Sequence, residues 1–394
     1  MVEEKPSDLV CLAGQRHSAE SEHSTEVLSP VLRLNFDVLS IIFNVSWDRD
    51  VKSSKTLSSV CRHWRGVALS VPQLWTQLPP HYYGNEEYLI MILNRSHPLP
   101  LHVMLSSQTH PNQRRILATV TERFGCLKLL DELDIMENNF PILERLEFSL
   151  NTIVHWDRLN KKKTSLLDAS RFPKLKEFHN PRQQLPLSRL IMPNSLPPLQ
   201  VLSINSDGQT DWVSVVSQCA DTLVSLYILV TCTEGLEAKF IFPRLQYISI
   251  VESRTDHPVH LHINAPYLLS IHESLDSRAW PSQLLLKLRY PQTVQNLYIE
   301  RNAVNPAEYP GLRNLWIVAD MVDVVVHLIK DVVQNCLLLE SVQYHTGNWQ
   351  AGNQIEKMIE DAVQASGRCI STSQMKSSTL ELPGSIPRNV RLLR

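Results

Sequence analysis

The sequence predicts a fold between the α+β and α/β classes, in which a small three-helix module (residues 31–80) precedes a curved solenoid of short parallel strands with helices on its convex side. Two observations predict it. A frame of Leu-x-x-apolar-x-apolar recurs from Leu130 to Tyr344, whereas apolar residues over 32–78 follow helical spacing instead. Hydrophobic residues make up 43% of the 394-residue chain, which is enough for a continuous core.

Charge, hydropathy and cysteine usage bound the class of protein. The formal net charge of −2 gives the chain no global attraction to nucleic acid or membrane. The N-terminus lacks a basic segment leading into an apolar one, and the apolar stretch over 321–329 is far too short to span a bilayer. The seven cysteines form no C-x-x-C pair, which is typical of a reducing compartment. We therefore expect an intracellular protein, cytoplasmic or nuclear, that binds no nucleic acid and does not enter a membrane.

The first segment, residues 1–30, is rich in Ser, Glu and His and predicts a disordered leader. A phosphorylated regulatory segment is the alternative. Beyond the helical module we expect connecting helices and a strand over 81–125, the repeats over 126–350, and a C-terminal helix and tail over 351–394.

The helical module begins with apolar residues at helical spacing, Phe36, Leu39, Ile42 and Phe43, after Asn35 as an N-cap. A polar stretch over 46–55 separates these from a second apolar run over 57–68. Pro72 ends that run, and Leu74 and Trp75 are expected in a short loop. A module of this size cannot bury all of these aromatic side chains within itself. Part of its apolar surface must therefore pack on the rest of the chain or on another protein.

Three motifs in this module resemble the F-box. They are Leu34-Asn-Phe-Asp-Val-Leu-Ser-Ile-Ile-Phe43, then Val60-Cys61-x-x-Trp64, then Pro72-x-Leu74-Trp75. Three of the family's four signatures are intact, and the departure is Asn35 where the family usually has Pro. The segment that follows, over 89–105, is similar to the connecting helix and first strand of F-box proteins from basidiomycete fungi. The short segment over 185–190 is similar to another sequence that recurs in those proteins.

The resemblance implies a substrate-recognition adaptor of an SCF-type cullin–RING ubiquitin ligase. The F-box would dock on the Skp-type subunit and through it on a cullin, while the repeats would bind an unknown protein substrate. The residues it implies for Skp-type adaptor binding are Leu34, Phe36, Leu39, Ile42, Phe43, Val60, Cys61, Trp64, Leu74 and Trp75. Among these we expect Trp64 to be mostly internal, and Leu34, Phe36 and Leu39 to be mostly interfacial. The alternative is a repeat scaffold whose F-box serves no ubiquitin ligation.

The repeat frame predicts the solenoid. Clear copies start at Leu130, Leu143, Leu199, Leu223, Leu245, Val294, Leu312 and Leu339, and weaker copies start at Leu175 and Leu268. From Leu175 onward the starts lie 18 to 27 residues apart, which resembles the leucine-rich repeat period. Only 13 residues separate the first two frames, so either one of them is spurious or the turn between them is compressed.

Two features accompany the frames. Six frames carry Pro two residues before the first Leu, at 141, 173, 197, 243, 266 and 310, where Pro fits the start of a strand. The eighth position after the first Leu is small or polar, including Asn138, Asn151 and Asn302, which resembles a degenerate asparagine ladder. Helical patterns over 212–219 and 320–336 occupy two of the intervals. The alternative is an ordinary α/β domain.

No phosphate-binding loop, nucleophile elbow or zinc-protease motif occurs, so we expect a binding protein with no catalytic residues, cofactor or metal. The sharpest site-like feature is the set His257, His260, His262 and His272, for which surface histidines are favoured over a zinc site or an enzyme. The run over 161–163 of three lysines predicts a solvated loop rather than a localisation or phosphate-binding patch. Four tryptophans can line a binding face or belong to the core: Trp212, Trp280, Trp316 and Trp349.

Overall fold

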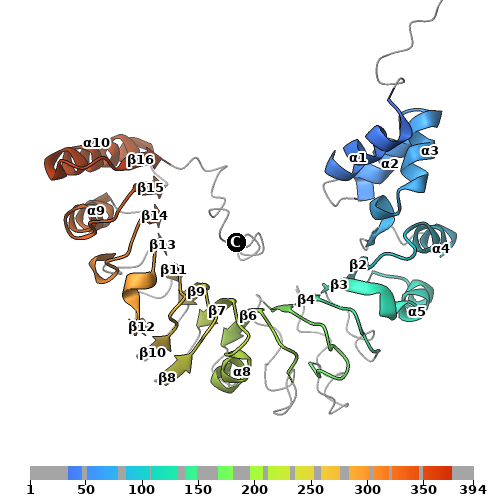
Figure 1. Cartoon of the computed structure of the whole chain (residues 1–394), viewed down its shortest axis with the longest axis horizontal. Coiled ribbons are helices and arrows are strands. Elements are labelled where there is room, and N and C mark those ends of the chain that lie inside the picture. The colour runs from blue at the N-terminus through green and yellow to red at the C-terminus, as the bar shows by residue number, and fades with distance from the viewer. Residues whose placement is uncertain are drawn as a thin grey trace, which may run out of the picture.

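The computed structural model forms an open arc, with the N-terminal helices at one end and the C-terminal helices at the other (Figure 1). It describes residues 34–46, 51–78, 86–106, 108–130, 138–148, 167–180, 196–206, 212–230, 236–252, 259–275, 284–300, 306–318, 322–345 and 349–374. A 13-stranded parallel sheet lines the inside of the arc, in the order β1-β2-β3-β4-β5-β6-β7-β9-β11-β13-β14-β15-β16. Because neighbours in the sheet follow one another along the chain, the curved α/β arrangement expected from the sequence is present.

The N-terminal module contains helices α1 (Phe36–Ser46), α2 (Val51–Ser59) and α3 (Arg62–Ser70), followed by the 3₁₀ turn η2 (Pro72–Trp75). Asn35 caps α1 as predicted, because its Oδ1 accepts the backbone N–H of Val38 at 2.9 Å. Helix α2 begins within the polar stretch over 46–55 and ends inside the second apolar run. The apolar run over 57–68 divides at Cys61, whose extended backbone starts α3 and whose Sγ accepts the Trp64 N–H at 3.4 Å.

The module is continuous with the sheet. Strand β1 (Gln77–Leu78) follows η2 directly and pairs with β2 (Leu101–Leu105). The Trp75 side chain is buried, donates from Nε1 to the Ala68 carbonyl at 2.9 Å, and lies under the guanidinium of Arg95 at the end of α4 (Glu86–Arg95). The sheet thus extends beyond residues 126–350 at both ends, and one hydrophobic core runs from the module to the C-terminal strands.

The remaining strands of the inner sheet are β3 (Phe124–Leu129), β4 (Arg145–Phe148), β5 (Glu177–His179), β6 (Val201–Ser206), β7 (Ser225–Val230), β9 (Tyr247–Glu252), β11 (Ser270–Leu275), β13 (Asn296–Glu300), β14 (Asn314–Val318), β15 (Ser341–His345) and β16 (Ser371–Gln374). Their register aligns the second apolar position of each repeat frame in one buried row. The row consists of Leu127, Leu146, Phe178, Leu202, Leu226, Ile248, Ile271, Leu297, Leu315 and Val342.

The frame predicted at Leu130 is the spurious one. Strand β3 ends at Leu129, and its buried residues Phe124, Leu127 and Leu129 follow the same spacing with an aromatic residue in the first position. Residues 131–137, which held the rest of the predicted frame, lie outside the described part of the chain.

Four of the six prolines that precede a frame belong to a tight turn rather than to the strand itself. In four of these repeats the N–H of the first Leu donates to the carbonyl three residues earlier, as Leu143 does to Phe140 at 3.3 Å and Leu175 does to Phe172 at 3.2 Å. Pro therefore occupies the second position of the turn, where its fixed φ is favourable. The residue before it is buried, and the Phe140 and Phe172 rings stack with centroids 5.3 Å apart.

The sequence predicted helices on the convex side. In the structure that side carries both helices and strands. Helices α5 (Pro111–Ala118), α8 (Trp212–Cys219), α9 (Val322–Asn335) and α10 (Trp349–Ser366) lie outside the inner sheet, but its middle is covered by a second parallel sheet of β8 (Leu236–Ile241), β10 (Val259–Asn264) and β12 (Leu284–Leu288) (Figure 1). These segments alternate buried and exposed residues with period two, which suits a strand and not a helix. Three further 3₁₀ turns are η4 (Thr121–Arg123), η7 (Pro291–Thr293) and η8 (Pro306–Glu308).

No described helix is both long and apolar enough to cross a bilayer.

Candidate docking surface and concave face

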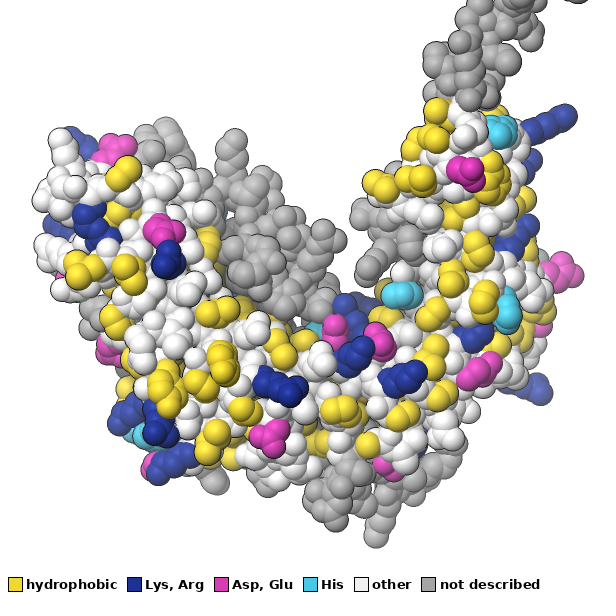
Figure 2. Space-filling model, viewed as in Figure 1, with side chains coloured by type: hydrophobic (Ala, Val, Ile, Leu, Met, Phe, Trp, Pro, Cys, Tyr) yellow, Lys and Arg dark blue, Asp and Glu magenta, His cyan; other side chains and the backbone are white. Residues whose placement is uncertain are grey.

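Helix α1 carries apolar residues on its exposed side as well as on its buried side. Leu39 and Phe43, four residues apart, are fully buried and anchor the helix to the module. The rest of the helix exposes an apolar set: Phe36 (46% exposed), Val38, Ile41 (62%), Ile42 and Val45 (82%). A surface helix of a globular protein normally places polar residues on this side, so the exposed set is typical of a face that another protein covers. We call these five residues the α1 face, and Figure 2 shows hydrophobic side chains gathered over this end of the arc.

Residues at the start of α3 contact α1 and the chain just before it. The Trp64 ring packs on Phe43 with centroids 5.0 Å apart, and the Nε2 of His63 is 3.1 Å from the Leu34 carbonyl at the start of α1. The guanidinium Nε of Arg65 donates to the Ser58 carbonyl at 2.9 Å and so closes the end of α2. These contacts fix the position of α1 relative to the other two helices.

The structure sorts the predicted adaptor-binding residues by exposure. Leu39, Phe43, Leu74 and Trp75 are buried in the core of the module. Leu34, Cys61 and Trp64 are half-buried. Phe36, Ile42 and Val60 are exposed and open to a partner.

The expectation that Leu39 is interfacial was wrong, because its side chain is 0% exposed and shares the buried face of α1 with Phe43. Sequence reasoning missed Val38, Ile41 and Val45, which are all exposed. They lie out of phase with Leu39 and Phe43. An apolar residue in the wrong phase on an amphipathic helix is the signal that could have found them.

The concave face is formed by the side chains that alternate with the core row. One of its rows reads Lys128, Glu147, His179, Ser203, Tyr227, Ser249, His272, Tyr298, Trp316 and Gln343 in register across the inner sheet. Polar and aromatic groups thus replace the aliphatic ones of the core, and most of them, Trp316 included, are buried in this structure.

The N-terminal third of this face carries a charge network. Glu147 is bound by Lys128 on one side and by Arg145 at 3.3 Å, and Arg145 also lies 3.7 Å from Glu177. His179 contacts the same Glu177 carboxylate at 3.5 Å, and this contact, helped by Arg145, holds the pKa of Glu177 below its usual range. The network therefore balances its own charges.

The middle third is aromatic. The Tyr227 and Tyr247 rings lie 5.0 Å apart on neighbouring strands, and burial raises the pKa of both hydroxyls. Next to them Ser249 Oγ is 2.9 Å from His272 Nδ1, and the His272 ring meets Tyr298 edge-on at 4.5 Å. Both tyrosines stay neutral at physiological pH, so the pair brings no charge to this part of the concave side.

The C-terminal third holds an asparagine ladder at a different position from the predicted one. Asn296 donates to Ser270 at 3.0 Å, Asn314 donates to Asn296 at 2.9 Å, and Ser341 donates to Asn314 at 2.7 Å. The ladder occupies the second position after the first apolar residue of the frame and faces the concave side. Two residues of the ladder predicted at the eighth position, at 151 and 302, lie outside the described residues, and Asn138 belongs to the spurious frame.

The other candidates from the sequence do not come together. His260 and His262 are on β10 of the outer sheet, His272 is on β11 of the inner sheet, and His257 lies outside the described residues. Within the described ranges no cluster of three His, Cys, Asp or Glu residues could hold a metal ion. Trp212 and Trp316 are buried. The lysines at 161–163, Trp280 and the side chain of Trp349 are not among the described groups.

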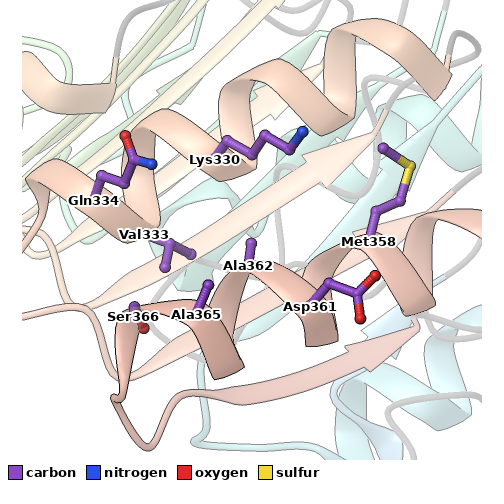
Figure 3. Close-up of a pocket in the computed structure, with 8 residues that line it drawn as sticks. All are labelled: Lys330, Val333, Gln334, Met358, Asp361, Ala362, Ala365 and Ser366. Atoms are coloured by element: carbon purple, nitrogen blue, oxygen red, sulfur yellow. The ribbon is translucent and has the colours of Figure 1, made fainter.

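A groove of about 410 Å³ separates α9 and α10 (Figure 3). It is lined mainly by short side chains of α10 such as Ala362 and Ala365, with Lys330 on one wall and Asp361 on the other. It brings together no nucleophile, base or metal-ligand set among the described residues, so it adds no chemistry to the surfaces above.

No protein-family model matches this chain, and no curated protein matches it in sequence.

Proposed function

We propose that this chain is a substrate-recognition adaptor of an SCF-type cullin–RING ubiquitin ligase, in which residues 34–78 act as an F-box and the solenoid acts as a leucine-rich repeat domain that binds a protein substrate. The observation that carries the proposal is the α1 face, an exposed apolar surface on a helix whose sequence resembles the first helix of an F-box. The Skp-type subunit is the partner that this resemblance implies.

The arrangement of the two surfaces supports the same role. The α1 face lies at one end of the arc, and the concave face lines its inside (Figure 1). Because strand β1 joins the module to the sheet directly, a substrate on the concave face would be held at a fixed position relative to the docked ligase. Such an adaptor accelerates ubiquitin transfer by raising the effective concentration of a substrate lysine near the conjugating enzyme, and it needs no catalytic group of its own.

Point variants on the α1 face test the docking half. Ile41→Asp places a charge at a site that is 62% exposed, so the free module still folds while the apolar contact is lost. Ile90→Asp on α4 is the matched control, because Ile90 is 46% exposed and lies outside the module. Deletion of residues 34–78 is a poor substitute, since it also removes β1 and the Trp75 packing.

The measurement is co-purification of the full chain with a Skp-type adaptor and a cullin. We expect the wild type and Ile90→Asp to retain both, and Ile41→Asp to lose both. Equal retention by the two variants would refute the α1 face as the docking surface. Adaptor binding without cullin would favour a repeat scaffold that serves no ubiquitin ligation.

A further inference from the structure

The outer sheet of β8, β10 and β12 has one face toward the core and one toward solvent. Ala238, Phe240, Leu261 and Ile263 point inward and are buried. The alternate residues face outward in three rows, which the parallel register defines. We call this solvent side the outer strand face: Glu237, His260 and Leu285 in the first row, Lys239, His262 and Lys287 in the second, and Ile241, Asn264 and Arg289 in the third.

The outer strand face is basic although the chain as a whole carries a net charge of −2. Lys239, His262 and Lys287 are aligned across the three strands, so the backbone positions of the two lysines lie roughly 10 Å apart, twice the strand spacing, with the imidazole between them. Arg289 directly follows the last residue of β12, and its backbone N–H donates to the Ile263 carbonyl at 2.9 Å. Figure 2 shows dark-blue and cyan side chains gathered at the lower left, where these strands lie.

Ion pairs within the outer strand face leave two of its positive charges free to contact a partner. Among the residues of this face, Glu237 is the single carboxylate, and it lies 3.2 Å from Lys239 and 3.5 Å from His262. Lys287 is exposed and forms no ion pair with any described residue. Arg289 lies over the Tyr290 ring at 5.6 Å, a contact that keeps its charge. Two permanent positive charges thus face solvent without a carboxylate partner among the described groups.

Apolar side chains lie at opposite corners of the same face. Ile241 is 67% exposed at the end of β8, and Leu285 is 50% exposed at the start of β12. These two exposed aliphatic side chains offer apolar contact area to a partner that binds across the face. A partner for this face therefore needs carboxylates for the cationic row and apolar side chains for the two corners.

We propose that the outer strand face binds an acidic polypeptide segment that also contains aliphatic residues. Nucleic acid fits less well. A nucleic-acid site of useful affinity neutralises roughly six to ten phosphates, more than the few cations here can match. The corners would also present aliphatic groups, and not the aromatic platforms on which bases stack. This surface lies on the convex side of the arc, apart from both surfaces used in the proposed function.

The experiment measures fluorescence anisotropy of the intact chain with a fluorescein-labelled peptide of Glu and Leu residues. The same peptide with Gln in place of Glu and a labelled oligouridylate serve as comparison probes. We expect the acidic peptide to bind, and its affinity to fall when NaCl is raised from about 50 mM to about 300 mM, because exposed charges are screened. Lys287→Glu should weaken binding at least about fivefold by reversing the charge at one end of the cationic row.

The matched control is Lys357→Glu, which reverses an exposed lysine on α10 and should change affinity less than about twofold. Equal effects of the two reversals would overturn the proposal, as would tighter binding of the oligouridylate or of the Gln peptide. A wild-type dissociation constant above about 1 mM would overturn it too. The Ile41→Asp chain separates this site from the docking function: it should bind the acidic peptide like the wild type, and loss of binding there would place the site elsewhere.

Discussion

Glu273 on β11 pairs in register with Ile250 on β9, so a carboxyl group occupies a row of side chains that is otherwise apolar. The next residue of the row is Ile299 on β13, and all three side chains are buried. The Glu273 Oε1 atom has no hydrogen-bond partner among the described residues. Burial, and then the nearby Glu308 and Glu252 carboxylates, raise the pKa of Glu273 to about 7, although the Tyr309 hydroxyl lowers it.

This carboxyl group makes stability depend on pH. Because its pKa is about 7 in the folded chain and 4.5 in the unfolded chain, the folded state binds the proton more tightly. Stability therefore falls as pH rises from about 4.5 to about 7, by about 3 kcal/mol at most. Glu273→Gln removes the ionisation and should stabilise the chain at pH 8.5 by about 1–3 kcal/mol, with a much smaller gain at pH 5. Urea midpoints at the two pH values measure it, and a gain independent of pH would contradict it.

A close backbone approach makes Gly311 irreplaceable. A Cβ at this position would lie 2.1 Å from the Gln292 carbonyl oxygen and 3.2 Å from that of Val294. Both contacts are to backbone, so Gly311→Ala should destabilise the chain by more than about 2 kcal/mol. Gly66→Ala is the matched control, because Gly66 lies in α3 with open space around it and alanine there should stabilise by about 0.5–1 kcal/mol. Thermal unfolding followed by circular dichroism would show opposite shifts, and a Gly311→Ala chain as stable as the wild type would contradict the contact.

The repeat frame predicted the inner sheet because each frame records a physical requirement of the solenoid. Leu202 and Ile204, for example, must both point into the core, and every other frame repeats that alternation at the strand. The helix α1 was predicted for a similar reason, since Asn35 and the spacing of Leu39 and Phe43 are local signals.

Other features depend on contacts between distant residues, which a single sequence does not display. The outer strands lack the repeat frame, and their alternation becomes meaningful only when β8, β10 and β12 lie side by side. The division of the docking residues into core and surface depends on where α3 and η2 pack against α1. For that reason Leu39 was expected at an interface and Ile41 was overlooked.

Leu39 and Ile42 on α1 should respond differently to truncation. Leu39 is fully buried beside Phe43, so Leu39→Ala should leave a cavity and destabilise the module by about 2–4 kcal/mol. Ile42 is 39% exposed, so Ile42→Ala should change stability by less than about 1 kcal/mol while removing part of the α1 face. Hydrogen exchange of residues 36–70 separates the two effects, and equal protection in both variants would contradict the assignment of Leu39 to the core.

Arg368 joins the last two convex helices to the sheet through three backbone carbonyls. Its Nη1 donates to Val333 at 2.9 Å, and its Nη2 donates to Leu337 at 2.8 Å and Leu339 at 3.1 Å. The first acceptor lies in the last turn of α9, where a cation also meets the negative end of the helix dipole. Because lysine cannot reproduce the fork of donors, Arg368→Lys should destabilise the chain by about 1–2 kcal/mol.

Arg313 provides the control for Arg368. It forms an ion pair with Glu340, but both side chains are about half exposed, so Arg313→Lys should change stability by less than about 0.5 kcal/mol. Chemical denaturation of the two variants gives the comparison, and hydrogen exchange should show faster opening at the end of α9 in Arg368→Lys alone. Equal losses in the two variants would mean that the charge of Arg368, and not its three backbone hydrogen bonds, fastens the C-terminal helices.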